Sequence, residues 1–325
     1  MPKLPIYLVI GFLSASCTSP ESDRFAYVER VASVLGKDAV TAQVALSPTP
    51  SERSLRLEIA EHKINPLQFA DLHRCDMGDL VGERNSGLGR FAPASQRLGY
   101  EIRWLCRARG CELEWLEDLA GAKRTSLPML YWNATIAGPE FSSLLRQDGG
   151  DVDLSMLVPL KPSMPEDCDF QQVEFEQALN RVQRAGGING RRAEWARFRE
   201  ALTNVTIVLK DLKRPLCLND GPTAKAERLF AVFRRYYVED LQPRMSAALR
   251  KDREWVEALH DFHRSFDDVA PEVWSTFYSH TLNPESDHSE WQATHQAIVT
   301  HSQAWQHIFH QCGVDIRSVV GQRES

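Results

Sequence analysis

Histidine is the residue type whose clustering first suggests chemistry in this chain. Eight of the ten histidines lie between His260 and His310, and imidazole is a common metal ligand. His260, His263 and Asp267 stand at helical offsets of zero, three and seven, which would place all three on one face of a helix. A metal ion could bind there with further ligands from elsewhere. The alternative is a solvated face on which His263 and Asp267 pair at i and i+4.

Motifs of other catalytic classes do not occur in the sequence. It contains no G-x-S-x-G, S-x-x-K or H-E-x-x-H pattern and no phosphate-binding P-loop. The sequence therefore predicts no catalytic residue and no cofactor. A metal-assisted envelope enzyme that uses the two histidines and the aspartate stays open as an alternative.

A second candidate site lies in the segment 82–101, GERNSGLGRFAPASQRLGYE. Its glycines are not spaced as G-x-G-x-x-G, and a helix rather than a strand is expected before it, so a dinucleotide loop is not indicated. We expect a polar turn between two helices, because buried polar groups must pair. Glu83, Arg84, Arg97 and Glu101 would form an ion-pair network. The alternative is a small-anion site near Arg84 and Arg97. The candidate residues are Glu83, Arg84, Asn85, Arg90, Gln96, Arg97 and Glu101.

The N-terminus reads MPKLPIYLVIGFLSASC. Lys3 precedes an apolar run of ten residues, 4–13, which is much shorter than the roughly 20 residues that a spanning helix needs. A secretory leader fits this pattern. Small residues directly before Cys17 resemble a bacterial lipobox, in which that cysteine is acylated. An ordinary signal peptide cleaved near Ser16, with an incidental cysteine, is the alternative.

Two details refine this interpretation of the leader. Ser14 stands where a lipobox usually carries Leu, Val or Ile. Thr18, rather than Asp, follows the cysteine, which by analogy with lipoprotein sorting suggests the outer membrane. We therefore expect an outer-membrane lipoprotein that faces the periplasm and contacts the membrane through its acyl chains.

Six cysteines remain after Cys17, and an even number in an exported chain suggests up to three disulfides. The favoured pair is Cys217 with Cys312, and the next is Cys75 with either Cys106 or Cys111. Buried free thiols are the alternative. No C-x-x-C motif indicates a redox centre or a zinc ribbon.

Composition limits the class of protein further. The chain has 325 residues, 43% apolar and 25% charged, with a net charge of -6. These values are typical of a globular protein, and the acidic balance argues against nucleic-acid partners. Between residues 181 and 199 the arginines form a locally basic segment. We interpret it as a solvated helix face.

Apolar residues at steps of three and four predict an all-α fold. Trp195, Phe198 and Leu202 illustrate the stripe of one helix over 189–212. The expected architecture is an irregular multi-helix bundle or two packed helical lobes. Its predicted parts are a signal peptide (1–16), a tether (17–24), an N-terminal lobe (25–147), a Pro/Gly-rich connection (148–168) and a C-terminal lobe (169–325).

Several motifs together resemble a known family. GERNSGLGR…SQRLGYE, LPMLYWNA, FRRYYVEDLQP and WQHIFHQCG, with the lipobox, occur in order over about residues 17–314. They are similar to the uncharacterised proteobacterial predicted-lipoprotein family labelled domain of unknown function 3080. The resemblance implies an envelope lipoprotein without assigned catalytic residues. We therefore expect a binding or assembly module, with an envelope protein as a further partner.

Overall fold

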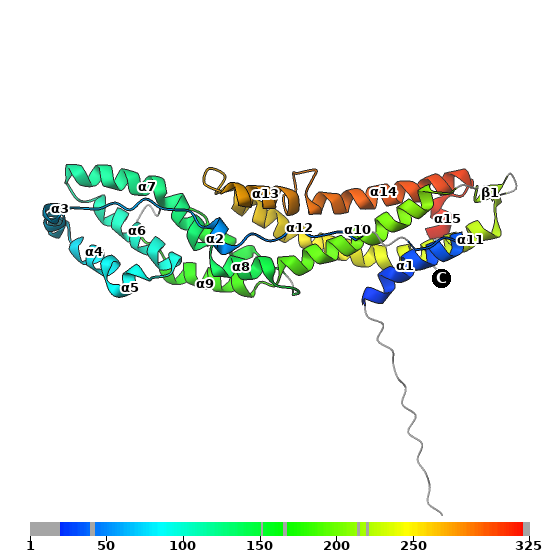
Figure 1. Ribbon diagram of the computed structural model, residues 1–325, viewed down its shortest axis with the longest axis horizontal. Helices are drawn as coiled ribbons and strands as arrows, with labels where there is room; N and C mark the ends of the chain where they lie inside the picture. The colour runs from blue at the N-terminus through cyan, green and yellow to red at the C-terminus, as the bar shows by residue number, and fades with distance from the viewer. Residues whose placement is uncertain are drawn as a thin grey trace, which may run out of the picture. The chain divides into compact units, whose positions relative to one another are not determined.

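The computed structural model describes residues 20–39, 43–150, 152–164, 168–212, 215–218 and 221–320, and it shows the predicted all-α fold (Figure 1). A two-stranded antiparallel sheet joins β1 (Cys217–Leu218) to β2 (Gly221–Pro222). Within these ranges, no helix combines the length and apolar character needed to cross a bilayer. The predicted leader and Cys17 lie outside the described residues.

Two compact units divide the chain, and each is assembled from segments far apart in the sequence. Of the described residues, unit 1 contains those within 20–41, 204–243 and 304–320, and unit 2 contains those within 42–203 and 244–303. The predicted connection at 148–168 lies within unit 2. Helices α10 (Ile188–Lys210) and α14 (Glu290–Gln311) supply residues to both units.

Unit 1 is built around aromatic side chains. Its other helices are α1 (Pro20–Leu35), α11 (Ala224–Val232), the π-helical segment η3 (Phe233–Leu241) and α15 (Ile316–Val320). The Tyr27 hydroxyl accepts a hydrogen bond from Trp305 Nε1 at 3.0 Å, and its ring stacks on Tyr237. Phe233 lies 4.4 Å from Trp305 between ring centroids. Burial of these rings holds α1, η3 and the end of α14 together.

Unit 2 contains most of the helices. They are α2 (Glu52–Leu55), α3 (Pro66–Asp71), η1 (Leu72–Cys75), α4 (Gly78–Asn85), α5 (Gly87–Arg90), α6 (Ala94–Ala108), α7 (Glu114–Ala134), α8 (Pro139–Arg146), η2 (Ser155–Leu160), α9 (Gln172–Arg184), most of α12 (Gln242–Arg264) and α13 (Glu272–Thr281). Helices α6 and α7 run side by side (Figure 1). Trp132 is buried at the centre of the unit, where its ring meets Phe266 and Trp274 edge-on.

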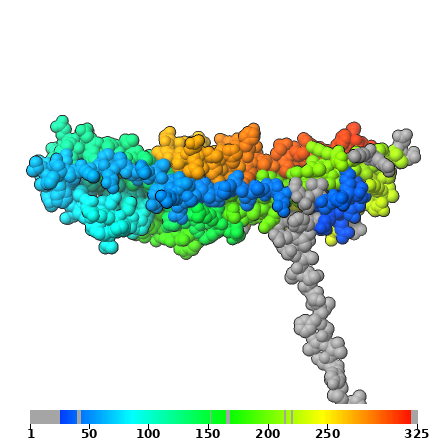
Figure 2. Space-filling model, in the orientation of Figure 1, coloured from blue at the N-terminus to red at the C-terminus, as the bar shows by residue number. Residues whose placement is uncertain are grey.

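An extended segment, residues 43–65, lies on the outside of unit 2 (Figure 2). The only helix in this segment is the single turn of α2. Side chains of neighbouring helices, rather than a partner strand, form hydrogen bonds with its backbone. Val44 N donates to Glu200 Oε1 at 2.7 Å, and the Leu57 backbone exchanges two hydrogen bonds with the Asn133 side chain. Trp132 Nε1 donates to Leu55 O at 2.7 Å. These contacts fix the path of the segment.

Candidate functional site

The turn between α4 and α5 depends on a serine and a glycine of the GERNSGLGR motif. Ser86 Oγ donates to Glu83 O at 2.7 Å and accepts from Gly89 N at 3.0 Å, so it ends one helix and caps the next. A Cβ at Gly89 would lie 2.2 Å from Glu83 O and 2.6 Å from Arg84 O. Only glycine therefore allows this close approach of backbone to backbone.

Two arginines are held on this turn by neighbouring carbonyl groups. Arg84 Nη1 donates to Gly89 O at 3.4 Å, and Arg97 Nη2 donates to Arg90 O at 2.7 Å. The Nε atoms of both arginines are buried without a hydrogen-bond partner. Burial, reinforced by the nearby charges of Arg84 and Arg56, lowers the pKa of Arg97. The turn is thus a concentration of positive charge.

The predicted ion-pair network of this motif is wrong. Glu83 pairs with Arg103 at 3.7 Å, and Glu101 pairs with Lys123 of α7. In the described chain, no carboxylate is bonded to either arginine of the turn. The two glutamates therefore brace α6 against its neighbours and leave the arginines uncompensated.

Other predicted residues of the motif lie at the surface. Asn85, Arg90 and Gln96 are all exposed. Arg90 contributes to the turn through its carbonyl oxygen, which accepts from Arg97. The structure thus brings together Arg84, Arg97 and the backbone of α5, but not the complete polar set.

The histidine cluster has local partners. His260 Nδ1 lies 2.8 Å from Tyr278 Oη, and His263 Nδ1 accepts from Trp274 Nε1 at 3.1 Å. His263 Nε2 lies 3.7 Å from Asp267, which is the i, i+4 contact predicted as the alternative. Burial above all lowers the pKa of His263, so this imidazole is neutral at pH 7. Among the described residues, no group of three or more His, Cys, Asp or Glu side chains is arranged to hold a metal ion.

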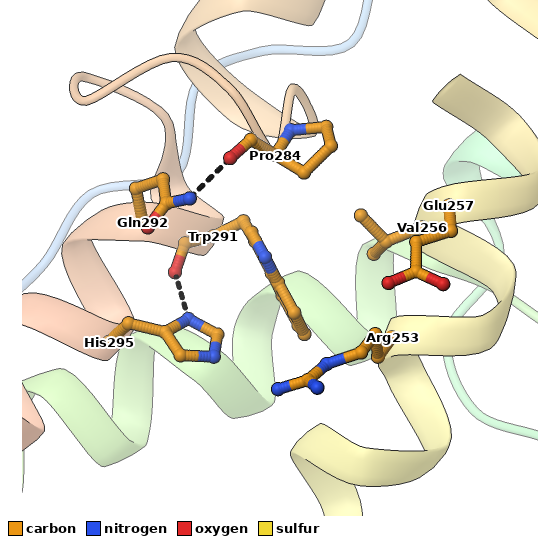
Figure 3. A pocket seen from close by; sticks show the side chains of 7 residues that line it. All are labelled: Arg253, Val256, Glu257, Pro284, Trp291, Gln292 and His295. Atoms are coloured by element: carbon orange, nitrogen blue, oxygen red, sulfur yellow. Dashed lines mark hydrogen bonds between the residues drawn. The ribbon is translucent and has the colours of Figure 1, made fainter. Parts of the chain in front are cut away.

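A pocket of about 230 Å³ lies between α12, α14 and the loop that precedes α14 (Figure 3). Its walls are Arg253, Val256, Glu257, Pro284, Trp291, Gln292 and His295. Figure 3 shows that α12 supplies one wall and that Trp291, Gln292 and His295 form the other. Gln292 Nε2 donates to Pro284 O and so ties the loop to the helix.

The polar groups of the pocket carry opposite charges. Arg253 and Glu257 are exposed, and neither is bonded to another side chain in the described ranges. His295 Nδ1 donates to the Trp291 carbonyl oxygen at 3.0 Å. The pocket therefore offers one cation, one anion and an imidazole beside an indole ring.

A buried ion pair lies next to the aromatic wall of the pocket. Arg191 Nε and Nη2 donate to the two carboxylate oxygens of Asp252 at 2.7 and 2.8 Å. Trp195 and Trp255 also donate to this carboxylate, at 2.8 and 3.0 Å. Trp195 stacks on Trp255 and meets Trp291 of the pocket wall at 4.9 Å. A bidentate pair with two further donors fixes the relative positions of α10 and α12.

A second buried pair fastens the extended segment. Arg192, 0% exposed, donates from Nε and Nη2 to Glu290 at 2.7 and 2.8 Å. Ser47 joins this pair, because its carbonyl accepts from Arg192 at 2.8 Å and its N–H donates to Glu290 at 3.2 Å. The prediction of a solvated basic face is thus wrong for Arg191 and Arg192. No local signal in the sequence distinguishes these two arginines from the other arginines of α10.

All six cysteines of the described chain form disulfides. The pairs are Cys75–Cys111, Cys106–Cys168 and Cys217–Cys312. The favoured prediction, Cys217 with Cys312, is confirmed. Cys111 is the partner of Cys75, one of the two alternatives that the sequence left open.

Comparison with known proteins gives one finding. A family model described as Protein of unknown function (DUF3080) matches residues 25–316. No curated protein matches the chain, and no solved structure does.

Proposed function

The chain belongs to this family of unknown function over residues 25–316, and we therefore propose its role from its own residues: a lipid-anchored envelope protein that binds an anionic group through Arg84 and Arg97. It would face the periplasm from the outer membrane, as a binding or assembly module with an envelope protein as a further partner.

Sequence and disulfides support the location. The apolar leader ends in small residues directly before Cys17, which is the pattern of an acylated lipoprotein. Three disulfides are typical of exported proteins, since cytosolic thiols are kept reduced. An acyl anchor with more than one chain would hold the protein stably at a membrane.

The binding activity rests on one observation, the uncompensated pair of arginines. Their buried Nε atoms have lost water without gaining a partner, which costs stability. The guanidinium fork matches carboxylate and phosphate oxygens, so an anion beside Arg84 and Arg97 would pair with guanidinium hydrogens that the two carbonyls do not use. The carbonyls of Gly89 and Arg90, on the turn that Ser86 caps, hold the arginines in place before any ligand arrives.

Arginine side-chain NMR tests this proposal directly. We expect the Nε–Hε resonances of Arg84 and Arg97 to shift as inorganic phosphate is added to the isotope-labelled protein. Arg264, which is exposed on α12, provides the matched control. An Arg84→Gln, Arg97→Gln variant should lose the saturable response. Equal, unsaturated shifts at all three arginines would show that the turn binds no anion.

The pocket beside Trp291 supports a second candidate function. Because Arg253 and Glu257 present opposite unpaired charges, the pocket suits a small zwitterion such as a free amino acid. Calorimetric titration with amino acids should give heat that Arg253→Ala abolishes. The same heat from wild type and variant, or none from any amino acid at millimolar concentration, would remove this candidate.

A further inference from the structure

Two large apolar side chains project from the same turn that holds the arginines. Leu88 is 90% exposed and Phe91 is 88% exposed. They are three residues apart, on α5 and at its C-terminal cap, and side chains at this spacing are neighbours on a helical turn. A single exposed apolar residue is ordinary, whereas two of this size at this spacing form a small apolar patch that is open to a partner.

Positive charge surrounds this apolar pair. Arg84 and Arg97 are anchored on the carbonyls of Gly89 and Arg90, and the Arg90 side chain is itself exposed. The motif's own carboxylates do not offset these charges, because Glu83 pairs with Arg103 and Glu101 with Lys123. The surface is therefore both cationic and apolar.

We propose that the turn formed by residues 84–97 docks onto an anionic phospholipid surface, with Leu88 and Phe91 entering the acyl region and Arg84 and Arg97 binding lipid phosphates. This inference rests on the proposed anion binding and names its ligand. Interfacial binding of this kind combines buried apolar area with attraction to anionic lipids.

The shape of the turn favours a bilayer over a protein partner. Side chains about nine-tenths exposed project from the surface, and a protein partner would need a matching pocket for each of them. A fluid headgroup layer accepts projecting side chains without a matching cavity. A phosphodiester carries the anionic oxygens that paired guanidinium groups bind, and the acyl chains below it accept Leu88 and Phe91. One ligand thus explains both features of the turn.

Vesicle flotation tests the inference on the whole mature chain, residues 17–325, exported behind a conventional signal peptide with Cys17→Ser so that no acyl chain is attached. Vesicles contain phosphatidylcholine alone or with about one third phosphatidylglycerol. We expect at least tenfold stronger binding to the anionic vesicles, and the binding should weaken as salt is added. The double variant Leu88→Ser, Phe91→Ser should bind at least tenfold more weakly. Arg84→Gln, Arg97→Gln should reduce it more than tenfold, at roughly fivefold per arginine. Circular dichroism establishes that each variant is folded.

Matched controls lie elsewhere in unit 2. Val158, which is 72% exposed, tests whether loss of any exposed apolar side chain weakens vesicle binding. Arg264 tests whether loss of any exposed positive charge does so. Val158→Ser and Arg264→Gln should bind as the parent chain does.

The outcomes separate this inference from the proposed function. If the arginine variant loses binding but the apolar variant does not, anion binding stands and membrane insertion is overturned. If phosphate shifts the arginine resonances but vesicles do not bind, the ligand is a soluble anion or an acidic protein, and the membrane inference fails. If phosphate does not shift the arginine resonances and vesicle binding does not depend on the two arginines, both proposals fail together.

Discussion

Neutralising Glu290 should destabilise the protein more than any surface charge change. Its carboxylate is nearly buried and accepts from Arg192, which is fully buried, and from Ser47 N. Glu290→Gln keeps the size of the side chain but removes its charge, and it turns an amide donor toward a guanidinium that only donates. Breaking a buried pair by removing one partner costs about 3–5 kcal/mol. We expect a loss in this range.

A double-mutant cycle separates the ion pair from other effects. Arg192→Met alone leaves the carboxylate buried and unpaired, and it should also cost about 3–5 kcal/mol. The combined variant removes both charges, so its cost should fall below the sum of the single costs by about 3 kcal/mol. The remaining loss would come from Ser47, whose carbonyl and N–H both lose charged partners.

Urea unfolding followed by far-ultraviolet circular dichroism measures these free energies. Glu239→Gln is the control, because Glu239 faces Arg235 on an exposed surface at 3.5 Å, and exposed pairs contribute about 0–1 kcal/mol. A loss below about 1 kcal/mol for Glu290→Gln, or strictly additive single costs, would refute the reasoning that the pair is buried and coupled.

Three further predictions concern the disulfides, pH and the anchor. Replacing Cys217 and Cys312 by Ser frees a loop with a sequence separation of 95 residues, and should cost about 4 kcal/mol in urea unfolding without reductant. His301 is buried, which lowers its pKa to about 3. The unfolded chain therefore binds more protons below pH 6.5, and stability should fall by about 2 kcal/mol at pH 5; His301→Gln should flatten this dependence, whereas exposed His310→Gln should not. Cys17→Ala should abolish incorporation of labelled palmitate, and unchanged labelling would contradict the lipobox interpretation.

The helices could be predicted because their signals are local. The stripe that includes Trp195 and Phe198 predicted the helix that the structure shows as α10, Ile188–Lys210. Pro128 lies inside α7 without ending it, although proline removes a backbone hydrogen bond.

The buried ion pairs could not be predicted, because their partners are distant in the sequence. Arg191 is 61 residues from Asp252, and Arg192 is 98 residues from Glu290. No local pattern predicts which arginine on a helix will meet such a carboxylate. The same limit explains the error in the turn, where Glu101 was expected to pair four residues away but instead meets Lys123 on the next helix.

Arg191 and Arg192 differ from Arg84 and Arg97 in the groups that their guanidinium hydrogens meet. Arg191 and Arg192 each have a bidentate carboxylate as a counter-ion. Arg84 and Arg97 are partly buried as well, but they receive only backbone carbonyls, and the glutamates of their own motif pair elsewhere. A carboxylate in this turn would stabilise the folded chain. The proposed anion would take the place of that carboxylate, and the exposed Leu88 and Phe91 would enter the lipid surface beside it.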